Sequence, residues 1–380
     1  MKTENLKIGE GNPSADPGAG LKEKAVAGAF WTTVATGSVR ALAALSNLIL
    51  AKLLAPEVFG VIAIAQIIIG AMEQFSDFGI GKALIQFRGN TEKAARTAFT
   101  LRMAQGGILF LAALVLAEPL ARFYETPVLR YVTPVLGLNF IIVSAGAIPM
   151  NVLSEDLQFR KQVLPNILPA FLQASTAITL AALGFGVWSV ILGMALFSSA
   201  QTLLFLKATP VKLGIVFDRG IARHLMSFGL PLFGSGLTFF AVYYIDKMVV
   251  GKVLGMDALG YYYFAFIVIS LPTTEIVYLI NRVMFPTYSR LGDLPWDLKN
   301  AYLKTLRYIT LITVPLSLGI PLFGGDLFRA LYGEKWTAAI YPLQAFGVYA
   351  FMRSFGATTG SLFMALGKTR ELLYNALIGL

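Results

Sequence analysis

Residues 251–260 read GKVLGMDALG and repeat residues 51–60, AKLLAPEVFG, at a spacing of 200 residues without a gap. Lys52 corresponds to Lys252, and Gly60 corresponds to Gly260. Each copy is a short charged connection between two long apolar runs, so the match repeats a helix, a loop and a helix. The sequence therefore predicts two copies of one helical bundle.

The composition places this bundle in a membrane. Hydrophobic residues make up 56% of the 380 residues, charged residues only 14%, and the mean hydropathy is +0.69. A soluble domain could not bury that much apolar surface, and apolar runs of about 20 residues have the length that spans a bilayer as a helix. We expect an all-α integral membrane protein with 10 to 11 transmembrane helices. The spans are predicted at residues 25–50, 59–81, 98–117, 131–152, 165–184, 187–206, 227–250, 258–281, 303–323 and 338–366, and an eleventh begins near Leu372.

Lysine and arginine are concentrated in alternate connections. With a cytoplasmic amino terminus, 22 of these residues fall on the cytoplasmic side and 6 on the outer side. Because positive charge is retained in the cytoplasm, this asymmetry predicts a cytoplasmic amino terminus. It also accounts for the net charge of +10 through anionic lipid, without nucleic acid as a partner.

The repeat extends further along the chain and defines the predicted domains. Glu118, Tyr124 and Pro134 recur as Asp326, Tyr332 and Pro342 at a spacing of 208. Because six spans separate the copies, the repeat is parallel, related by an axis along the membrane normal. We expect a disordered cytoplasmic head (residues 1–24), a six-helix N-lobe (25–206), a cytoplasmic linker (207–226) and a C-lobe (227–380). The C-lobe would hold four complete helices and the start of a fifth, so the second copy is expected to be truncated.

Two stretches carry a resemblance to a known family. Residues 45–66, LSNLILAKLLAPEVFGVIAIAQ, are followed by FSDFGIGKALIQ at 75–86, and residues 228–255 read FGLPLFGSGLTFFAVYYIDKMVVGKVLG. They resemble the polysaccharide transporter branch of the multidrug/oligosaccharidyl-lipid/polysaccharide exporter superfamily, the Wzx-type flippases. The resemblance covers most of residues 25–370. That family normally has twelve or more spans, which the chain does not reach.

The resemblance implies a transporter for cell-surface polysaccharide synthesis, such as lipopolysaccharide or exopolysaccharide, in the inner membrane of a bacterium. The cargo would be a polyprenyl-pyrophosphate-linked oligosaccharide, moved by alternating access, with a polysaccharide polymerase and export machinery as further partners. Two alternatives stay open. One is a cation-coupled drug antiporter of the same superfamily, and the other is a non-transporting assembly partner of a polymerase.

Two arginines are the first candidates for cargo binding. Arg40 lies near the middle of the first span and Arg353 near the middle of the tenth. A charge at a helix centre costs about 2.5 to 3.5 kcal/mol on insertion scales, so such residues commonly serve function. A guanidinium can donate bidentate hydrogen bonds to phosphate oxygens, which suits a pyrophosphate. Alternatively, each arginine pairs within its own lobe and stabilises packing.

The seventh span carries Asp246 and Lys247. Lys247 is a candidate for binding phosphate or glycan, and Asp246 for binding a coupling proton or sodium ion. Adjacent residues point about 100° apart on a helix, so we expect no simple facing pair. The alternative for Lys247 is that it extends to the outer interface.

Glu73 and Glu275 occupy near-equivalent places in the second and eighth spans, two turns from the cytoplasmic end. They are candidates for ion coupling or for gating salt bridges between the lobes. The alternative is ordinary pairing with Lys82 and Arg282.

The sequence gives little support to an enzyme. It contains no G-x-x-x-x-G-K-[ST] nucleotide loop and no acidic loop pair suited to Mg²⁺. With no cysteine and one histidine, His224, we predict neither a metal site nor a cofactor. The arginines within spans favour an anionic cargo over a cationic drug.

Overall fold

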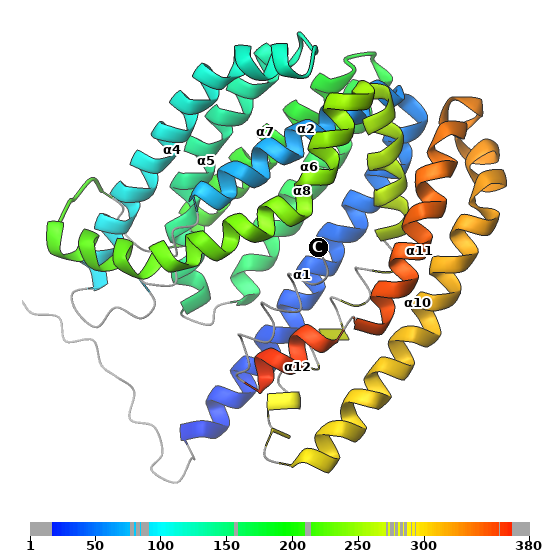
Figure 1. Cartoon of the computed structure of the whole chain (residues 1–380). Helices are drawn as coiled ribbons and strands as arrows, with labels where there is room; N and C mark the ends of the chain where they lie inside the picture. Colours follow the sequence, from blue (N-terminus) through cyan, green and yellow to red (C-terminus); the bar gives the residue numbers. More distant parts are fainter. Residues whose placement is uncertain are drawn as a thin grey trace, which may run out of the picture.

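The computed structural model describes residues 17–76, 91–155, 159–209, 214–270, 294–356 and 358–366, with isolated positions between 80 and 292 (Figure 1). All the regular structure in these residues is helical. The elements are α1 (Pro17–Leu53), α2 (Pro56–Ser76), α4 (Thr91–Phe123), α5 (Leu129–Glu155), α6 (Phe159–Ala182), α7 (Val187–Ala208), α8 (Arg219–Ser270), α10 (Pro295–Tyr332), the 3₁₀ helix η2 (Glu334–Ala339), α11 (Ile340–Gly356) and α12 (Thr359–Ala365).

Within the described residues, eight helices are long and apolar enough to cross a membrane. Their outward faces are apolar as well: Val115, Leu322 and Phe323 are each more than 70% exposed. Such side chains require a lipid environment. The predicted all-α membrane class is confirmed, and we place each helix end on the side that the charge count assigns to it.

Several helices extend beyond the predicted spans, as α4, α6 and α10 do, and two further differences have a local cause in the sequence. The predicted head ends at residue 24, whereas α1 already begins at Pro17, because proline suits the first turn of a helix. The predicted span 338–366 is not continuous, since α11 ends at Gly356 and α12 begins at Thr359. Residues 356–360 read GATTG, and glycine and threonine are poor helix formers. Residues 1–16 and 367–380, with the predicted start near Leu372, lie outside the described residues.

The repeat is visible in the backbone. Helix α8 is interrupted at Gly255, where φ is 84° and ψ is 178°. Gly255 corresponds to Ala55, which lies between the end of α1 and the start of α2. At the spacing of 208, Glu125 (φ 53°) after α4 corresponds to Gly333 (φ 75°) after α10. Both copies therefore turn in the same places, with glycine at the left-handed positions of the second copy.

The two copies pack on each other through their matched glycines. Helix α2 packs on α8 along its length. A Cβ at Gly60 would overlap the backbone oxygen of Met256, and a Cβ at Gly260 would overlap the backbone oxygen of Pro56. Met256 is itself the counterpart of Pro56. The contact is reciprocal, as expected for a pseudo-twofold axis between α2 and the second part of α8.

Further contacts join the lobes at their outer ends, and we call them the outer contact. Trp336 in η2 is fully buried, and its Nε1–H donates to the Ala51 backbone oxygen at 2.8 Å. Lys335 Nζ donates to the backbone oxygens of Lys52 at 2.8 Å and Leu54 at 3.0 Å. On the other side, Lys252 Nζ lies 3.1 Å from Glu125 Oε1. The outer contact thus joins the end of α1 to the C-lobe and the turn after α4 to α8.

The predicted division into lobes and a linker stays a prediction. Residues 214–218 are non-helical and lie against α4: Thr100 Oγ1 donates to the Val216 backbone oxygen at 2.9 Å, and Asp218 pairs with Lys93 at 2.6 Å. Helix α8 starts at Arg219, so the carboxyl-terminal part of the predicted linker is helical.

Candidate functional site

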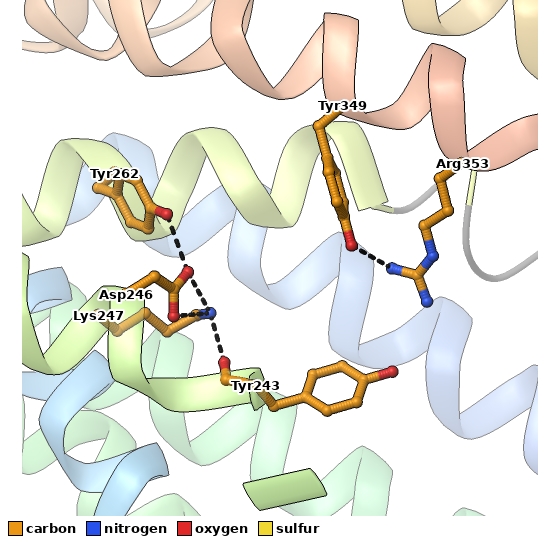
Figure 2. A network of polar contacts seen from close by, with 6 residues as sticks. All are labelled: Tyr243, Asp246, Lys247, Tyr262, Tyr349 and Arg353. Carbon is orange, nitrogen blue, oxygen red and sulfur yellow. Dashed lines mark hydrogen bonds and ion pairs between the residues drawn. The ribbon is translucent and has the colours of Figure 1, made fainter. Parts of the chain in front are cut away.

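Asp246 and Lys247 of α8 form a polar cluster with Tyr243 and Tyr262. Lys247 Nζ lies 3.1 and 3.2 Å from the two carboxylate oxygens of Asp246, and it donates to the Tyr243 backbone oxygen at 2.9 Å. Beyond the break at Gly255, Tyr262 donates its hydroxyl to Asp246 at 2.8 Å. Lys247 is only 5% exposed, and its ammonium lies 4.5 Å from the centre of the Phe266 ring. The cluster joins the two parts of α8 (Figure 2).

The expectation that Asp246 and Lys247 would not face each other is wrong. The 100° separation holds for the Cβ directions, but the four-carbon stem of lysine bends back along the helix to the carbonyl one turn earlier. A buried ammonium needs a partner because desolvation makes an isolated charge costly. In this conformation Lys247 balances Asp246 and does not extend to the outer interface.

Arg353 lies in a more open place on α11. Its Nη1 lies 3.3 Å from the Tyr349 hydroxyl, and its guanidinium lies 5.8 Å from the centre of the same ring. Arg353 is exposed, Tyr349 is 50% exposed, and Tyr243 on α8 is 53% exposed. The rings of Tyr243 and Tyr349 extend into the space between α8 and α11 (Figure 2). Arg353 and Tyr349 of α11, together with Tyr243 of α8, form a surface that we call the α11 wall. It offers a cation and two aromatic faces with hydroxyl groups.

Arg40 lies on a separate polar cavity between α1 and α6, with a volume of about 230 Å³. Thr32 and Thr36 of α1 and Gln162 and Asn166 of α6 share its lining. The Asn166 Nδ2 donates to the Gln162 backbone oxygen at 2.7 Å, and Gln201 of α7 donates to Asn166 Oδ1 at 3.0 Å. The cavity combines a guanidinium, two hydroxyls and two amides inside membrane-spanning helices.

Sequence reasoning found Arg40 but missed the amides around it. Gln162, Asn166 and Gln201 are uncharged and follow no motif, and their proximity depends on how α6 packs on α1 and α7. A usable signal is that Arg40, Asn166 and Gln201 fall within predicted spans, where polar groups are uncommon. Gln162 precedes the span 165–184 and gives no such signal.

Of the two glutamate candidates, Glu73 and Glu275, the structure describes only Glu73. Glu73 lies on an exposed face of α2, one turn before its end at Ser76. Gly70, one turn earlier on α2, packs against Tyr244 of α8, so Glu73 lies near the boundary between the lobes. Glu275, with its predicted partner Arg282, lies outside the described residues, and so does Lys82.

Comparisons with known proteins agree with this architecture. The chain is 26% identical over 354 residues to the lipopolysaccharide biosynthesis protein WzxC of Escherichia coli strain K12, covering 92% of this chain and 71% of WzxC. It is 25% identical to the succinoglycan biosynthesis transport protein ExoT of Rhizobium meliloti strain 1021, covering 77% of this chain and 59% of ExoT. The chain thus spans less than two thirds of the length of ExoT.

A solved structure shows the same fold. The lipid II flippase MurJ, in an inward closed conformation, matches with a TM-score of 0.71 at 15% identity, covering 88% of this chain and 76% of MurJ. The model of the family described as polysaccharide biosynthesis protein matches residues 49–341, which is most of the chain. The chain therefore belongs to this family of polysaccharide biosynthesis proteins.

Proposed function

We propose that this protein flips a lipid-linked oligosaccharide across the inner membrane of a bacterium during surface polysaccharide synthesis. The observation that carries the proposal is the polar cavity that holds Arg40 within membrane-spanning helices. The relatives named for lipopolysaccharide and succinoglycan synthesis, and the flippase fold, support the same activity.

The cavity and the α11 wall fit the two polar parts of such a cargo. A guanidinium matches a pyrophosphate through short, charge-assisted hydrogen bonds. Hydroxyl and amide groups exchange hydrogen bonds with sugar hydroxyls, and the exposed faces of Tyr243 and Tyr349 can stack on sugar rings. In this proposal Arg40 holds the pyrophosphate and Arg353 supports the glycan or the pyrophosphate during passage. Lys247 has an indirect role, because it already balances Asp246.

Alternating access fits the contacts between the lobes. The outer contact holds the lobes together at the outer ends of α1 and α8, so cargo release requires it to open. A proton or sodium ion could drive this step by neutralising Asp246, which would weaken its bonds to Lys247 and Tyr262 and loosen the two parts of α8. Glu73 and Glu275 are the other candidates for binding the coupling ion. The proposed protein partner is a polysaccharide polymerase.

Transport in sealed vesicles tests the proposal. The readout is the outward appearance of a polyprenyl-pyrophosphate-linked glycan, with a cationic dye as a competing cargo. Losing hydrogen bonds to a charged group costs about 1.5 to 3 kcal/mol, so Arg40→Ala should reduce transport by about 10-fold to 100-fold. Arg40→Lys should restore part of it, and Arg353→Ala should act in the same direction.

The matched control is Arg122→Ala. Arg122 lies at the end of α4 and is 79% exposed, where it pairs with Glu118 on the same helix. This variant should transport like the wild type. Full glycan transport by a well-folded Arg40→Ala, Arg353→Ala double variant would refute the role of the arginines. Dye movement without glycan movement would favour the drug antiporter.

A further inference from the structure

A second, apolar cavity of about 450 Å³ lies at the boundary between the lobes. Helices α2 and α4 form most of its lining, and Thr133 of α5 and Met248 of α8 complete it. Among the described residues that line it, side-chain hydroxyls belong to Tyr124 and Thr133 alone. The volume lies within the range of about 300 to 1,000 Å³ that is typical of ligand sites. None of the residues assigned above to the polar cargo lines it.

The cavity is elongated along α2, and part of its lining is exposed on the surface of membrane-spanning helices. Its lining on α2 runs from Ile64 to Phe75, which is about 16 Å at 1.5 Å per residue. Phe75, Ile108 and Leu116 line it and are 44%, 65% and 49% exposed. A hydrocarbon chain can therefore enter from the bilayer and lie along α2 and α4.

The two copies of the repeat differ at this place. Ile64 and Leu120 correspond to Phe264 and Phe328, whereas Tyr124 corresponds to Tyr332. The Phe264 ring lies 5.4 Å from the Phe328 ring, 5.2 Å from Tyr332 and 4.3 Å from Trp336, centre to centre. Aromatic rings fill these positions in the C-lobe, while smaller side chains leave space in the N-lobe. The cavity is therefore a property of the N-lobe sequence and not of the repeated fold.

We propose that this cavity binds part of the polyprenyl tail of the cargo while the pyrophosphate is at the polar site. The inference rests on the proposed function. Apolar contact with an isoprenoid chain is favourable inside a packed, water-free site. The site is also continuous with the lobe interface: a Cβ at Gly251 of α8 would lie 3.3 Å from Ile64 and 3.4 Å from Tyr124. Movement of the lobes thus changes its shape and can release the tail. A phospholipid that stays in its leaflet does not have to be bound and released as the lobes move.

Photolabelling tests the inference. Full-length protein in vesicles is exposed to a polyprenyl phosphate that carries a photoreactive group in its tail, and labelled peptides are identified. We expect labels on α2 and α4 around the cavity. Ala112→Phe, which fills the cavity from α4, should reduce labelling about tenfold, equivalent to about 1.4 kcal/mol of binding free energy.

Two further variants make the result specific. Val115→Phe adds the same ring on the 73% exposed face of α4, outside the cavity, and should label like the wild type. If Ala112→Phe fails to fold, the double variant Ile64→Phe, Leu120→Phe introduces the rings that the C-lobe has at the same positions. It should reduce labelling to a similar extent.

The outcomes separate this inference from the proposed function. Undiminished labelling in the filled variants would overturn it, as would equal competition by a phospholipid of the same chain length. Labelling of the cavity, lost in Ala112→Phe, would support the tail site even if no glycan appeared outside the vesicles. In that case the transport proposal would fail and the binding site would stand.

Discussion

Gly60 and Gly260 determine how closely the two lobes approach. A Cβ at either position would overlap a backbone oxygen of the other lobe, and a backbone atom cannot move aside as a flexible side chain can. Gly60→Ala or Gly260→Ala should therefore destabilise the protein by about 1 to 3 kcal/mol, the usual cost of overpacking. The measurement is thermal unfolding in detergent.

The control for this prediction is Gly107→Ala in α4. A Cβ there has nothing within 4 Å, and alanine is the better helix former by about 0.5 to 1 kcal/mol. Its unfolding temperature should stay unchanged or rise. Equal unfolding temperatures for Gly60→Ala and Gly107→Ala would contradict the close approach of the lobes.

Asp218 makes the stability of the predicted linker depend on pH. Its Oδ1 accepts the backbone N–H groups of Gly220 and Ile221 at the start of α8. The Lys93 ammonium, and then the Ile221 N–H, lower the pKa of this carboxyl below the usual 3.8. A depressed pKa means that the stabilising effect is fully present above pH 3.8 and is lost as the pH falls through the folded-state value.

Asp218→Asn isolates the charge, because asparagine is an equally good helix cap. The wild type should unfold at a slightly higher temperature than this variant at pH 6, and the difference should shrink below pH 3.8. Both side chains of the Lys93 pair are partly exposed, so the effect should be small and should weaken in high salt. A difference that grows on acidification would contradict the assignment.

At the scale of elements, η2 acts as a cap for α1. The last carbonyl groups of a helix lack partners within it. Here the Ala51 and Lys52 carbonyls at the end of α1 are met by Trp336 and Lys335 from the other lobe. The Lys335 ammonium also suits the negative end of the helix dipole. The end of α1 is therefore stabilised only while the outer contact is closed.

Trp336→Phe tests this cap, since it keeps an aromatic ring but removes the N–H donor. An unsatisfied buried carbonyl costs about 1 to 3 kcal/mol, so the outer contact should open more often. Because the chain has no cysteine, Leu54→Cys provides a single reporter. Leu54 is 4% exposed, and a membrane-impermeant thiol reagent added outside should react with it faster in the Trp336→Phe background. Leu254→Cys, its repeat counterpart at 65% exposure, should react equally in both backgrounds.

The elements differ in how far the sequence predicts them. Apolar length and the match of residues 51–60 with 251–260 are enough to place the helices of the bundle and the break at Gly255, because both depend on local sequence. The Asp246–Lys247 pair was missed because it depends on a side-chain rotamer. The amides of the Arg40 cavity were missed because their meeting depends on tertiary packing. Helix-forming propensity also explains why α11 and α12 are separate helices. The apolar length of residues 338–366 alone predicts one continuous span.

At the scale of the whole molecule, the repeat is nearly symmetric in backbone and asymmetric in side chains. The turns at Glu125 and Gly333 match, and so do the glycines of the lobe interface. Yet the N-lobe holds the Arg40 cavity and the apolar cavity, while aromatic rings fill the C-lobe core near η2. In the proposed mechanism, the symmetric backbone lets the two lobes rotate as similar bodies about their interface, and we propose that cargo binds mainly on the N-lobe because the two cavities lie there.

If the lobes must separate at their outer ends, joining them there should stop transport. Glu125 of the N-lobe and Lys252 of the C-lobe form an ion pair at 3.1 Å, so Glu125→Cys and Lys252→Cys place two thiols in reach of a short, reductively cleavable crosslinker. Crosslinking should abolish glycan export, and a reducing agent should restore it. Losing the ion pair itself should cost little, because both side chains are exposed.

The control joins two positions within one lobe. Glu118 and Arg130, at the outer ends of α4 and α5, form an ion pair as well. Glu118→Cys with Arg130→Cys under the same crosslinker should leave export unchanged, because those helices move as one body. Export that survives the Glu125–Lys252 crosslink would show that the outer ends do not separate during transport. Export lost in both crosslinked pairs would mean that the crosslinker acts on local structure and not on the rotation of the lobes.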